Sequence, residues 1–286
     1  MSVSDSVVRI DCGRFTLEGR SRAGNETFFR VKELGLALDI GRCPDFLIGV
    51  PDIFVTHSHL DHSLGIPFYA AQRLLQKLPT GHVYVPQENV SDYRELMKIH
   101  ERLEGVAYPL DLIGLKPGDE LSLRRDLKIR VHRSTHRVVA NAYEVVGSSA
   151  RLDEKFAGIA PDRLASLRNA GETLTTEVET SLLFYTGDTD SRILDENEHL
   201  YRTRVLVIEC SFTGEGERER GRLYTHIHLD DLIDVAKRFE NELIVLTHFS
   251  LRDSPASIHE RIRRRVPDFL RSRMRLALPP PHDQIM

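Results

Sequence analysis

The sequence, 286 residues long, has few cysteines, no long hydrophobic run and little net charge, and each absence argues against a class of protein. Its three cysteines are an odd number, so they cannot complete a disulfide framework, and we expect a reducing compartment. No apolar run approaches the roughly 20 residues that a membrane-spanning helix needs. The segment from Met1 to Ser21 is polar and interrupted by charges, unlike a signal peptide. These features predict a cytoplasmic protein with no membrane partner.

The formal net charge of -4 argues against a globally basic surface for nucleic acid. Any contact with phosphate must then come from a local patch of positive charge. The strongest basic stretch contains Arg261, Arg263, Arg264, Arg265, Arg271, Arg273 and Arg275. Such a run on a helix is usually only a solvated face, yet it is the strongest basic feature of an acidic chain and therefore one candidate for RNA contact. The mixed run from Glu215 to Arg222 has charges that largely cancel, and we expect an exposed loop there.

The sequence does contain one dense group of side chains that can bind metal. Directly after the apolar run 53–55, the chain contains His57, His59, Asp61 and His62. Residues two apart in an extended chain point to the same side, so His57 and His59 can meet one cation. The chain then turns, and Asp61 and His62 face a second position. Imidazole and carboxylate suit Zn²⁺, and an open coordination position would make the site catalytic, whereas the competing interpretation is a histidine-rich surface loop.

Three further ligand types follow predicted strands, which disfavours the surface loop. His136 follows an alternating run, Asp188 follows a strand that stops at glycine, and His248 follows a strongly apolar run. Each one alone is weak evidence, because a single His or Asp after a strand is more often a turn residue. In series they predict two metals, the first with His57, His59 and His136, the second with Asp61, His62 and His248. Asp188 has two carboxylate oxygens and could bridge them.

The pattern resembles the metallo-β-lactamase superfamily, whose signature His-x-His-x-Asp-His is matched in full at positions 57 to 62. Within it, the chain resembles the ribonuclease Z family, endonucleases that trim the three-prime trailer from precursor tRNA. The closer resemblance rests on Thr225-His226-Ile227-His228, which opens a helical pattern, and on Glu209 at an acidic position of the family. It runs from about Glu26 to Pro281 and is closest to compact plant-type short forms.

The resemblance implies an α/β fold, the metallo-β-lactamase four-layer αβ/βα sandwich, with the metal site at the edge of the two sheets. Because the predicted ligands are scattered from His57 to His248 and must converge, we expect one hydrolase domain over residues 1–286. Periodicity predicts strands at 28–31, 36–40, 53–56, 82–85, 127–131, 181–185, 205–208 and 243–247. It predicts helices at 66–78, 90–103, 162–170 and 229–239.

Two features common in bacterial ribonuclease Z have no visible counterpart in the sequence. These are an opening turn that contains Gly-Thr, and a long arm with a Gly-Pro motif that grips the tRNA elbow. Between His136 and Asp188 we expect only the short helix at 162–170 and a turn at 171–173. The sequence therefore supports the metal site more strongly than it supports the tRNA substrate.

The predicted ligands suit phosphodiester hydrolysis, because two cations lower the pKa of a shared water by several units and the hydroxide can attack phosphorus. Asp61 would also orient this nucleophile. By resemblance, His226 would protonate the departing oxygen, and Glu209 would hold that imidazole charged. The competing interpretation of His226 is a residue at a helix N-terminus. We interpret the remaining histidines as structural or surface residues: His82, His100, His132, His199, His228, His259 and His282.

The resemblance thus implies a dinuclear zinc-dependent tRNA three-prime endonuclease, with two Zn²⁺ (or Mn²⁺ or Fe²⁺) as cofactors and precursor tRNA as its partner. A small-molecule metallohydrolase, such as a cyclic-nucleotide phosphodiesterase or a lactonase, would suit the same site and the acidic charge. A metal-binding regulatory module is a third interpretation, which the complete ligand set disfavours. The family also implies a homodimer through the helix that begins at Ile66, although burial in the chain's own core would explain its apolar residues equally well.

Overall fold

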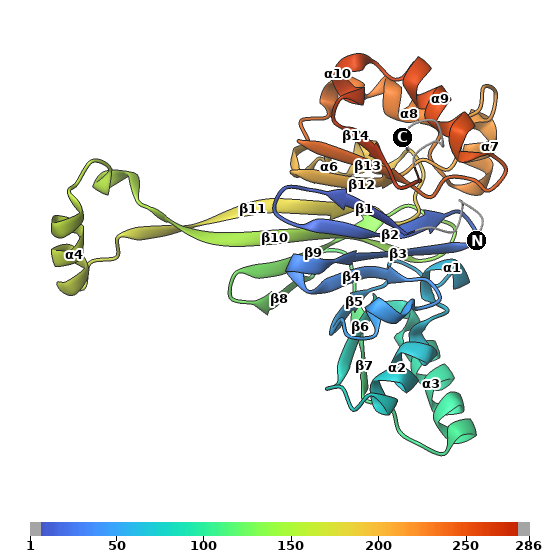
Figure 1. Cartoon of the computed structure of the whole chain (residues 1–286), viewed down its shortest axis with the longest axis horizontal. Helices are drawn as coiled ribbons and strands as arrows, with labels where there is room; N and C mark the ends of the chain where they lie inside the picture. Colours follow the sequence, from blue (N-terminus) through green and yellow to red (C-terminus); the bar gives the residue numbers. More distant parts are fainter. Residues whose placement is uncertain (1–6, 280–286) are drawn as a thin grey trace.

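Two seven-stranded sheets form the centre of the molecule, with helices on their outer faces (Figure 1). This computed structural model describes residues 7–279, so Pro280, Pro281 and His282 lie outside the described residues. The first sheet has the order β1-β2-β3-β4-β5-β6-β7, and the second has the order β14-β13-β12-β11-β10-β9-β8. The two sheets and their flanking helices confirm the predicted αβ/βα sandwich.

The elements have the following bounds. The first sheet contains β1 (Val8–Asp11), β2 (Thr16–Arg22), β3 (Glu26–Val31), β4 (Leu36–Ile40), β5 (Asp52–Phe54), β6 (Gly81–Pro86) and β7 (Leu110–Leu115). The second contains β8 (Glu120–Arg124), β9 (Leu127–Ser134), β10 (Ala140–Leu152), β11 (Thr175–Tyr185), β12 (Val205–Glu209), β13 (Leu243–Thr247) and β14 (Met274–Leu276). The α-helices are α1 (Leu60–Ser63), α2 (Ile66–Leu75), α3 (Val90–Glu104), α4 (Pro161–Asn169), α5 (Ile193–Glu196), α6 (His199–Arg202), α7 (Arg218–Tyr224), α8 (Leu229–Asp234), α9 (Pro255–Arg265) and α10 (Asp268–Arg271). Short 3-10 turns are η2 (Lys32–Leu34), η3 (Asp45–Leu47), η4 (Gln87–Asn89), η5 (Glu154–Phe156) and η6 (Ala236–Arg238).

Three hydrophobic clusters pack between these layers and hold them together. The inner cluster lies between the sheets and includes Phe54 of the first sheet and Val145 of the second. A second cluster joins the first sheet to α2 and α3, through residues such as Tyr69. A third joins the second sheet to α8 and α9, through Leu232 and Ile262. Because central strands are buried on both faces, their sequences are continuously apolar, and their positions were predictable.

All eight predicted strands are present in the structure, but six further strands were not predicted. Those strands, β1, β2, β7, β8, β10 and β14, are short, polar on one face or partly exposed. The predicted helix at 229–239 is shorter than expected, since α8 ends at Asp234 and η6 follows. The expectation of a loop at 215–222 is wrong, because α7 begins at Arg218, whose guanidinium pairs with Asp231 and Asp234 of α8.

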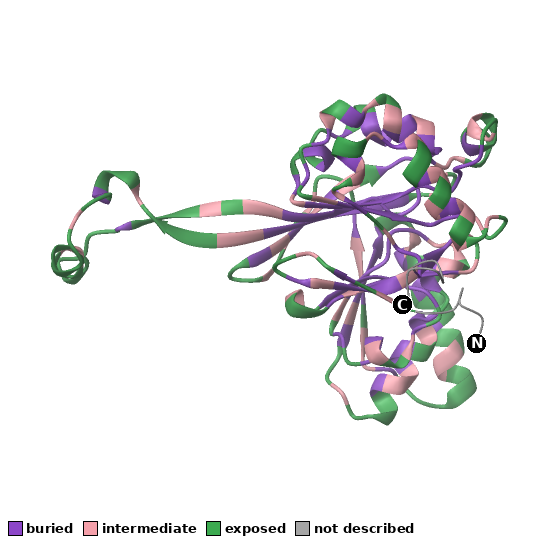
Figure 2. Ribbon diagram, turned by 45° about the horizontal axis from the view of Figure 1, so that its top comes forward, coloured by how far each residue is buried: buried purple, intermediate pink, exposed green. Residues whose placement is uncertain are grey.

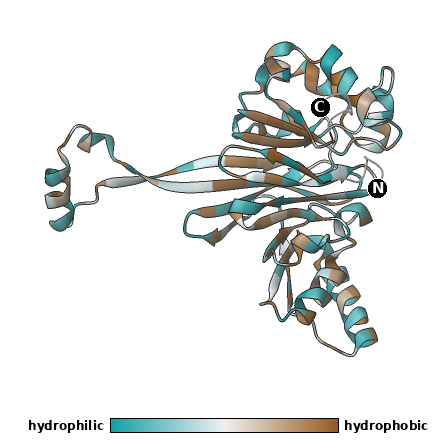
Figure 3. Cartoon of the chain, in the orientation of Figure 1, coloured by the Kyte–Doolittle hydropathy of each residue, from teal (hydrophilic) through white to brown (hydrophobic). Residues whose placement is uncertain are grey.

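A long arm is the largest departure from the sequence-based expectation. Strands β10 and β11 pair from Tyr143 opposite Tyr185 to Leu152 opposite Thr175, and they run far beyond the sandwich to α4 (Figure 1). Figure 2 shows these strands buried near the sandwich and mainly exposed farther out. Figure 3 shows the outer part pale or hydrophilic. The expectation that no arm is present is wrong, because exposed polar strands give no hydrophobic signal.

Among the described residues, no helix is both long and apolar enough to cross a membrane.

Candidate metal centre and active site

Loops that follow four strands meet at one edge of the sandwich and carry the seven predicted ligands. Strands β4, β5 and β6 are parallel, as are β11, β12 and β13, so their carboxyl ends lie at common edges. Strand β9 runs in the direction of β11, because both are antiparallel to β10. The loops after β5, β9, β11 and β13 therefore converge, as ligand loops on a rigid scaffold do.

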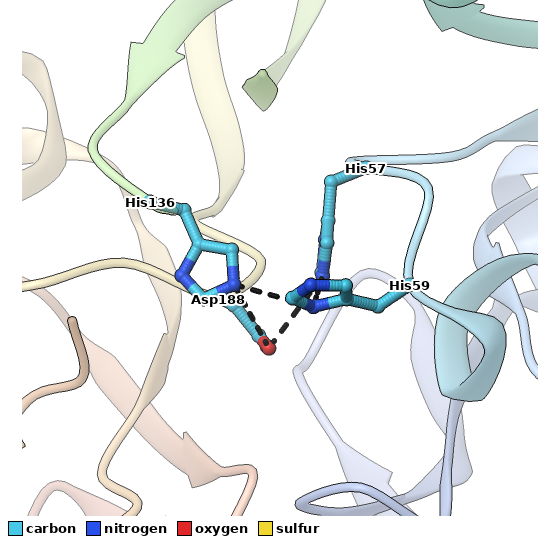
Figure 4. A group of neighbouring side chains, drawn as sticks. All are labelled: His57, His59, His136 and Asp188. Carbon is cyan, nitrogen blue, oxygen red and sulfur yellow. Dashed lines mark hydrogen bonds and ion pairs between the residues drawn. The ribbon is translucent and has the colours of Figure 1, made fainter. Parts of the chain in front are cut away.

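One group contains the side chains of His57, His59, His136 and Asp188, whose ligand atoms lie within 4.8 Å of one another (Figure 4). His57 Nε2 is 3.0 Å from His59 Nδ1, and His136 Nε2 is 3.3 Å from the same atom. Asp188 Oδ2 lies 3.6 Å from His57 Nε2 and 4.0 Å from His136 Nε2. Tetrahedral zinc with bonds of about 2.0–2.2 Å separates its ligand atoms by about 3.4 Å, so these spacings fit one ion.

A second group beside the first contains Asp61, His62 and His248. Asp61 Oδ2 lies 3.6 Å from both His62 Nε2 and His248 Nε2. Asp188 also faces this group, with Oδ1 3.2 Å from His62 Nε2 and Oδ2 3.2 Å from His248 Nε2. The Asp188 carboxylate thus stands between the two groups, where it could bridge two cations.

Three buried polar atoms in this centre lack a hydrogen-bond partner among the described residues: Asp188 Oδ1, His62 Nε2 and His248 Nε2. His62 Nδ1 donates to Asp39 Oδ2 at 2.7 Å, so Nε2 of the neutral ring carries a lone pair. That lone pair and Asp188 Oδ1 are two acceptors that face each other. A cation between them would satisfy both, so the donor set fits a metal.

The charges of the centre support the same conclusion. Burial lowers the pKa of His57, His59 and His136, so these rings are held in the neutral form that binds metals. Burial alone would also lower the pKa of His62, but the carboxylates of Asp188 and Asp39 raise it well above its ordinary value. The two carboxylates beside His62 therefore favour a positive charge at this position, which a proton or a bound cation can supply.

Outer partners fix the orientation of the histidines. His136 Nδ1 donates to the carbonyl of Thr225 at 3.2 Å, which leaves Nε2 as the free acceptor. His248 Nδ1 donates to Ser211 Oγ at 2.9 Å, and the Ser211 hydroxyl donates to Glu209 Oε2 at 2.6 Å. Such outer contacts set the ring tautomer and the ligand basicity.

Glu209 and His226 form a separate pair beside the ligand groups. His226 Nδ1 donates to Glu209 Oε1 at 2.8 Å, and Glu209 is fully buried. Burial lowers the pKa of His226, but the Glu209 carboxylate outweighs it and raises the pKa to about 9. A ring nitrogen of His226 lies within 4.8 Å of ligand atoms of Asp188 and His248, and the His226 and His248 ring centroids are 5.2 Å apart. The arrangement suits a proton donor that does not itself need to bind metal.

The backbone is strained where it carries these groups. Asp39, Thr225 and His248 have φ of 56°, 57° and 58°, in the left-handed region that non-glycine residues rarely adopt. Before Asp188, Gly187 has φ of 58°, and a Cβ there would lie 2.7 Å from Thr56 Cβ. A side chain at position 187 would therefore push the Asp188 loop away from the His57 loop.

Comparison with known proteins connects this centre with a family. Residues 45–249 match the model of the beta-lactamase superfamily domain. The chain is 32% identical to tRNase Z TRZ1 of Arabidopsis thaliana over 251 residues, covering 87% of this chain and 90% of that protein. It is 31% identical to the chloroplastic tRNase Z TRZ2 of the same plant, covering 88% and 72%. The chain belongs to the ribonuclease Z family of the beta-lactamase superfamily.

The resemblance inferred from the sequence motifs is thereby confirmed. The crystal structure of the human tRNase Z short form superposes with a TM-score of 0.59 at 18% identity, covering 82% of this chain and 92% of that chain. The metallo-beta-lactamase fold protein YhfI from Bacillus subtilis gives a TM-score of 0.61 at 15% identity, covering 91% and 94%. At these identities the two structures support the fold alone.

Several residues of this ribonuclease Z centre have contacts that sequence reasoning did not assign. Asp39 accepts hydrogen bonds from His62, from Tyr185 Oη at 2.6 Å and from the Thr56 amide at 2.7 Å. The hydroxyl of Ser211 links His248 to Glu209. The sequence held only a weak signal for both, namely polar residues at the ends of otherwise apolar strands.

The C-terminal arginine segment is less available for RNA than the sequence suggested. Five of its guanidinium groups pair with acidic side chains: Arg261 with Asp253, Arg263 with Glu260, Arg264 with Glu215, Arg265 with Asp230 and Arg271 with Asp268. Arg273 binds backbone carbonyls instead. Pairing neutralises most of the positive charge that this segment would offer to phosphate.

Other arginines lie closer to the ribonuclease Z centre. A cavity of about 570 Å³ is lined by His136 together with Arg133, Arg137 and Arg192. Arg192 pairs with Asp190. Arg133 and Arg137 are exposed, and neither has an acidic partner among the described residues. These two guanidinium groups can contact phosphate beside a predicted ligand.

Proposed function

We propose that this protein is a metal-dependent endoribonuclease that removes the three-prime trailer of precursor tRNA. The observation that carries the proposal is the Asp188 carboxylate between two histidine groups, where three buried ligand atoms have no hydrogen-bond partner among the described residues. Family membership supplies the substrate class, since relatives at 32% and 31% identity are tRNase Z proteins.

Two divalent cations, with zinc as the favoured metal, fit the donor set. His57, His59 and His136 would hold one, and Asp61, His62 and His248 the other, with Asp188 between them. Bound metals would supply an activated water and positive charge for the phosphoryl oxygens. Nitrogen and oxygen donors without thiolate agree with zinc, manganese or iron.

Side chains of the protein would orient the attacking water and protonate the leaving oxygen. Asp61 would accept a hydrogen bond from the attacking water, while its Oδ2 is held by the Gly24 amide at 2.9 Å. The water gives up one proton to bulk solvent, its oxygen adds to phosphorus, and the bond from phosphorus to the three-prime oxygen of the tRNA breaks. His226 would give its proton to that departing oxygen, and Glu209 would orient the ring and favour its protonated form.

The arm and the unpaired arginines support an RNA substrate over a small molecule. In bacterial ribonuclease Z such an arm grips the tRNA elbow, and here it occupies the segment between His136 and Asp188. Arg163 and Arg168 on α4 are exposed at its far end, without acidic partners among the described residues. Together with Arg133 and Arg137 they would give phosphate contacts on a chain whose net charge is -4.

The acidic net charge is the one observation that favours a small-molecule phosphodiesterase or lactonase. Purified protein should therefore be assayed side by side on precursor tRNA, bis(p-nitrophenyl) phosphate and a lactone. We expect cleavage of precursor tRNA that a chelator abolishes and that Zn²⁺ or Mn²⁺ restores, with His248→Ala inactive and His100→Ala unaffected. Turnover of only the small substrates by the metal-loaded protein would overturn the proposed substrate.

We also propose a homodimer through α2, the helix that begins at Ile66. Tyr69 and Ala70 of α2 are buried in the chain's own core, but Phe68 and Leu75 are 47% and 73% exposed, and Leu64 beside them is 51% exposed. An apolar patch of this kind is typical of an interface. Light scattering should give twice the chain mass for the wild type and the single mass for Phe68→Glu. A monomeric wild type would contradict the proposal.

We further infer a reducing, cytoplasmic setting. Cys12, Cys43 and Cys210 are all free thiols, and burial raises the pKa of Cys43 to about 12. A thiol with a raised pKa is rarely ionised and therefore reacts slowly, and free thiols are typical of reducing compartments.

A further inference from the structure

A third cluster of ligand side chains lies apart from the centre described above. His132 of β9, Glu144 of β10 and His199 of α6 place one ligand atom each within 4.8 Å of one another. The cluster shares no residue with either predicted metal group. It lies on the outer face of the second sheet, because the inner face of β9 is formed by Leu127, Ile129 and Val131. Neither His132 nor His199 belongs to a recognisable motif, so the sequence predicts only structural or surface roles for them.

The spacing of the three ligand atoms suits one small cation. Glu144 Oε2 is 2.9 Å from His132 Nε2 and 3.7 Å from His199 Nδ1. Tetrahedral zinc with bonds of about 2.0–2.2 Å places its ligand atoms about 3.4 Å apart. The pairs around Asp188 span 3.2 to 4.0 Å, so the third cluster is as closely drawn together as the predicted catalytic groups.

The charge of Glu144 is a second, independent reason to expect a cation at this cluster. Its side chain is only 2% exposed, and among the described residues its polar contacts are the two imidazoles and the hydroxyl of Ser181. Arg130 lies directly opposite on β9, but its guanidinium is bound to Glu120 and Glu179. A buried carboxylate needs compensating positive charge, which a cation held between Glu144 and the two imidazoles would supply.

The cluster is also reachable from solvent. His132 and His199 line a surface cavity of about 460 Å³, whose other charged lining residues are Asp119, Glu120, Glu196, Arg130 and Arg133. The His199 side chain is 58% exposed, so an ion could enter without opening the sheet. The fourth coordination position would face this cavity and take water.

We propose that His132, Glu144 and His199 form a third metal site, which binds a divalent transition ion of the zinc type. The ion would link α6 to β9 and β10 and neutralise the buried Glu144 carboxylate. It would stabilise the outer face of the second sheet and take no part in phosphodiester cleavage. The donor set, two imidazoles and one carboxylate, is one that zinc accepts.

The test compares the metal content of full-length variants. Wild type, His199→Ala and the control His100→Ala are equilibrated with Zn²⁺, dialysed and analysed for zinc per chain. We expect His199→Ala to hold one ion fewer than both other proteins, with unchanged hydrolysis of bis(p-nitrophenyl) phosphate. His199 is exposed, so its replacement is not expected to unfold the chain, and His132→Ala should give the same loss.

Crystals of the wild type soaked in zinc chloride provide the second measurement. An anomalous peak bounded by His132, Glu144 and His199 is expected, and it should disappear in His199→Ala. Equal zinc content in all three proteins together with no peak at the cluster would overturn the proposal. The test of the third site is the difference of one zinc ion between the variants. If the predicted catalytic groups bound no zinc, the zinc content of all three proteins would fall equally, and that result would count against the proposed function instead.

Discussion

At the scale of single residues, Asp39 connects the candidate centre to the body of the sheet. Its carboxylate is fully buried and accepts hydrogen bonds from His62, Tyr185 and Thr56. The contact with His62 Nδ1 aims Nε2 of that ring at Asp188. Asp39 is therefore a positioning residue, which acts on the second metal group through His62.

Replacing Asp39 by Asn should weaken metal binding without removing a ligand. The amide keeps the size of the side chain but loses its charge, so we expect roughly 10- to 100-fold weaker affinity for Zn²⁺. Competition with a chromogenic chelator measures this. Asp52→Asn makes the same chemical change away from the centre and should leave the affinity unaltered. Unchanged affinity in Asp39→Asn would show that His62 needs no such partner.

His226 can be separated from the metal ligands by the choice of leaving group. His226→Ala should retain its metals but cleave precursor tRNA roughly 100 to 10,000 times more slowly, the usual cost of a lost general acid. A p-nitrophenolate group departs without a proton, so bis(p-nitrophenyl) phosphate should be hydrolysed nearly as before. Equal losses on the two substrates would contradict proton donation by His226.

The sequence could identify residues whose signal is local. His57, His59, Asp61 and His62 stand in one short motif, and their convergence follows from a turn within that motif. The contact of Ser211 with His248 joins residues from different strands, and only the packed structure brings their side chains together. Outer-shell partners such as Ser211 could therefore not be predicted from spacing.

At the scale of elements, the arm is the feature with the clearest functional consequence. Its strands are hydrogen-bonded to each other, but beyond Gly147 and Thr180 they are mostly exposed, so they add little to the core. An element that stabilises the core so little is expected to serve binding. The sequence predicted α4 to within one residue but not the strands, because 148–152 and 175–179 lack an apolar face.

Removing the arm should therefore affect large substrates alone. We suggest replacing residues 149–178 by Asn-Gly, which joins Ser148 to Glu179 and keeps the Glu179 contacts with Lys128 and Arg130. The KM for precursor tRNA should rise on the order of tenfold or more through lost phosphate contacts. Hydrolysis of bis(p-nitrophenyl) phosphate and the Tm serve as controls, and both should stay unchanged. An unaltered KM for precursor tRNA would exclude the arm from substrate binding.

At the scale of the whole molecule, RNA is expected to bind where arginine side chains have no acidic partner. The most basic stretch of the sequence is largely neutralised by neighbouring acids, whereas Arg133 and Arg137 are free to contact phosphate beside His136. Sequence alone could count these charges but could not show which of them are paired. Likewise, periodicity predicted strands and helices, while the arrangement of two packed sheets came from the family resemblance.

This distribution predicts which arginines affect RNA binding. Arg133→Glu with Arg137→Glu should raise the KM for precursor tRNA and reduce the slope of log affinity against log salt by about 1 to 2. Arg264→Glu with Arg271→Glu makes the same change of charge at paired positions and should alter the slope less. Salt titrations of tRNA binding measure both variants. A larger effect of the second pair would place the RNA on α9 and α10 instead.

The central claim, that this metal centre cuts precursor tRNA at its three-prime trailer, is tested most directly by mapping the ends of the products. Precursor tRNA is incubated with the metal-loaded wild type and with Asp188→Ala, and both product ends are sequenced. The account predicts one cut after the discriminator nucleotide, a three-prime hydroxyl on the tRNA and a five-prime phosphate on the trailer, all absent with Asp188→Ala. Intact precursor under conditions in which the same wild-type preparation hydrolyses bis(p-nitrophenyl) phosphate would contradict it.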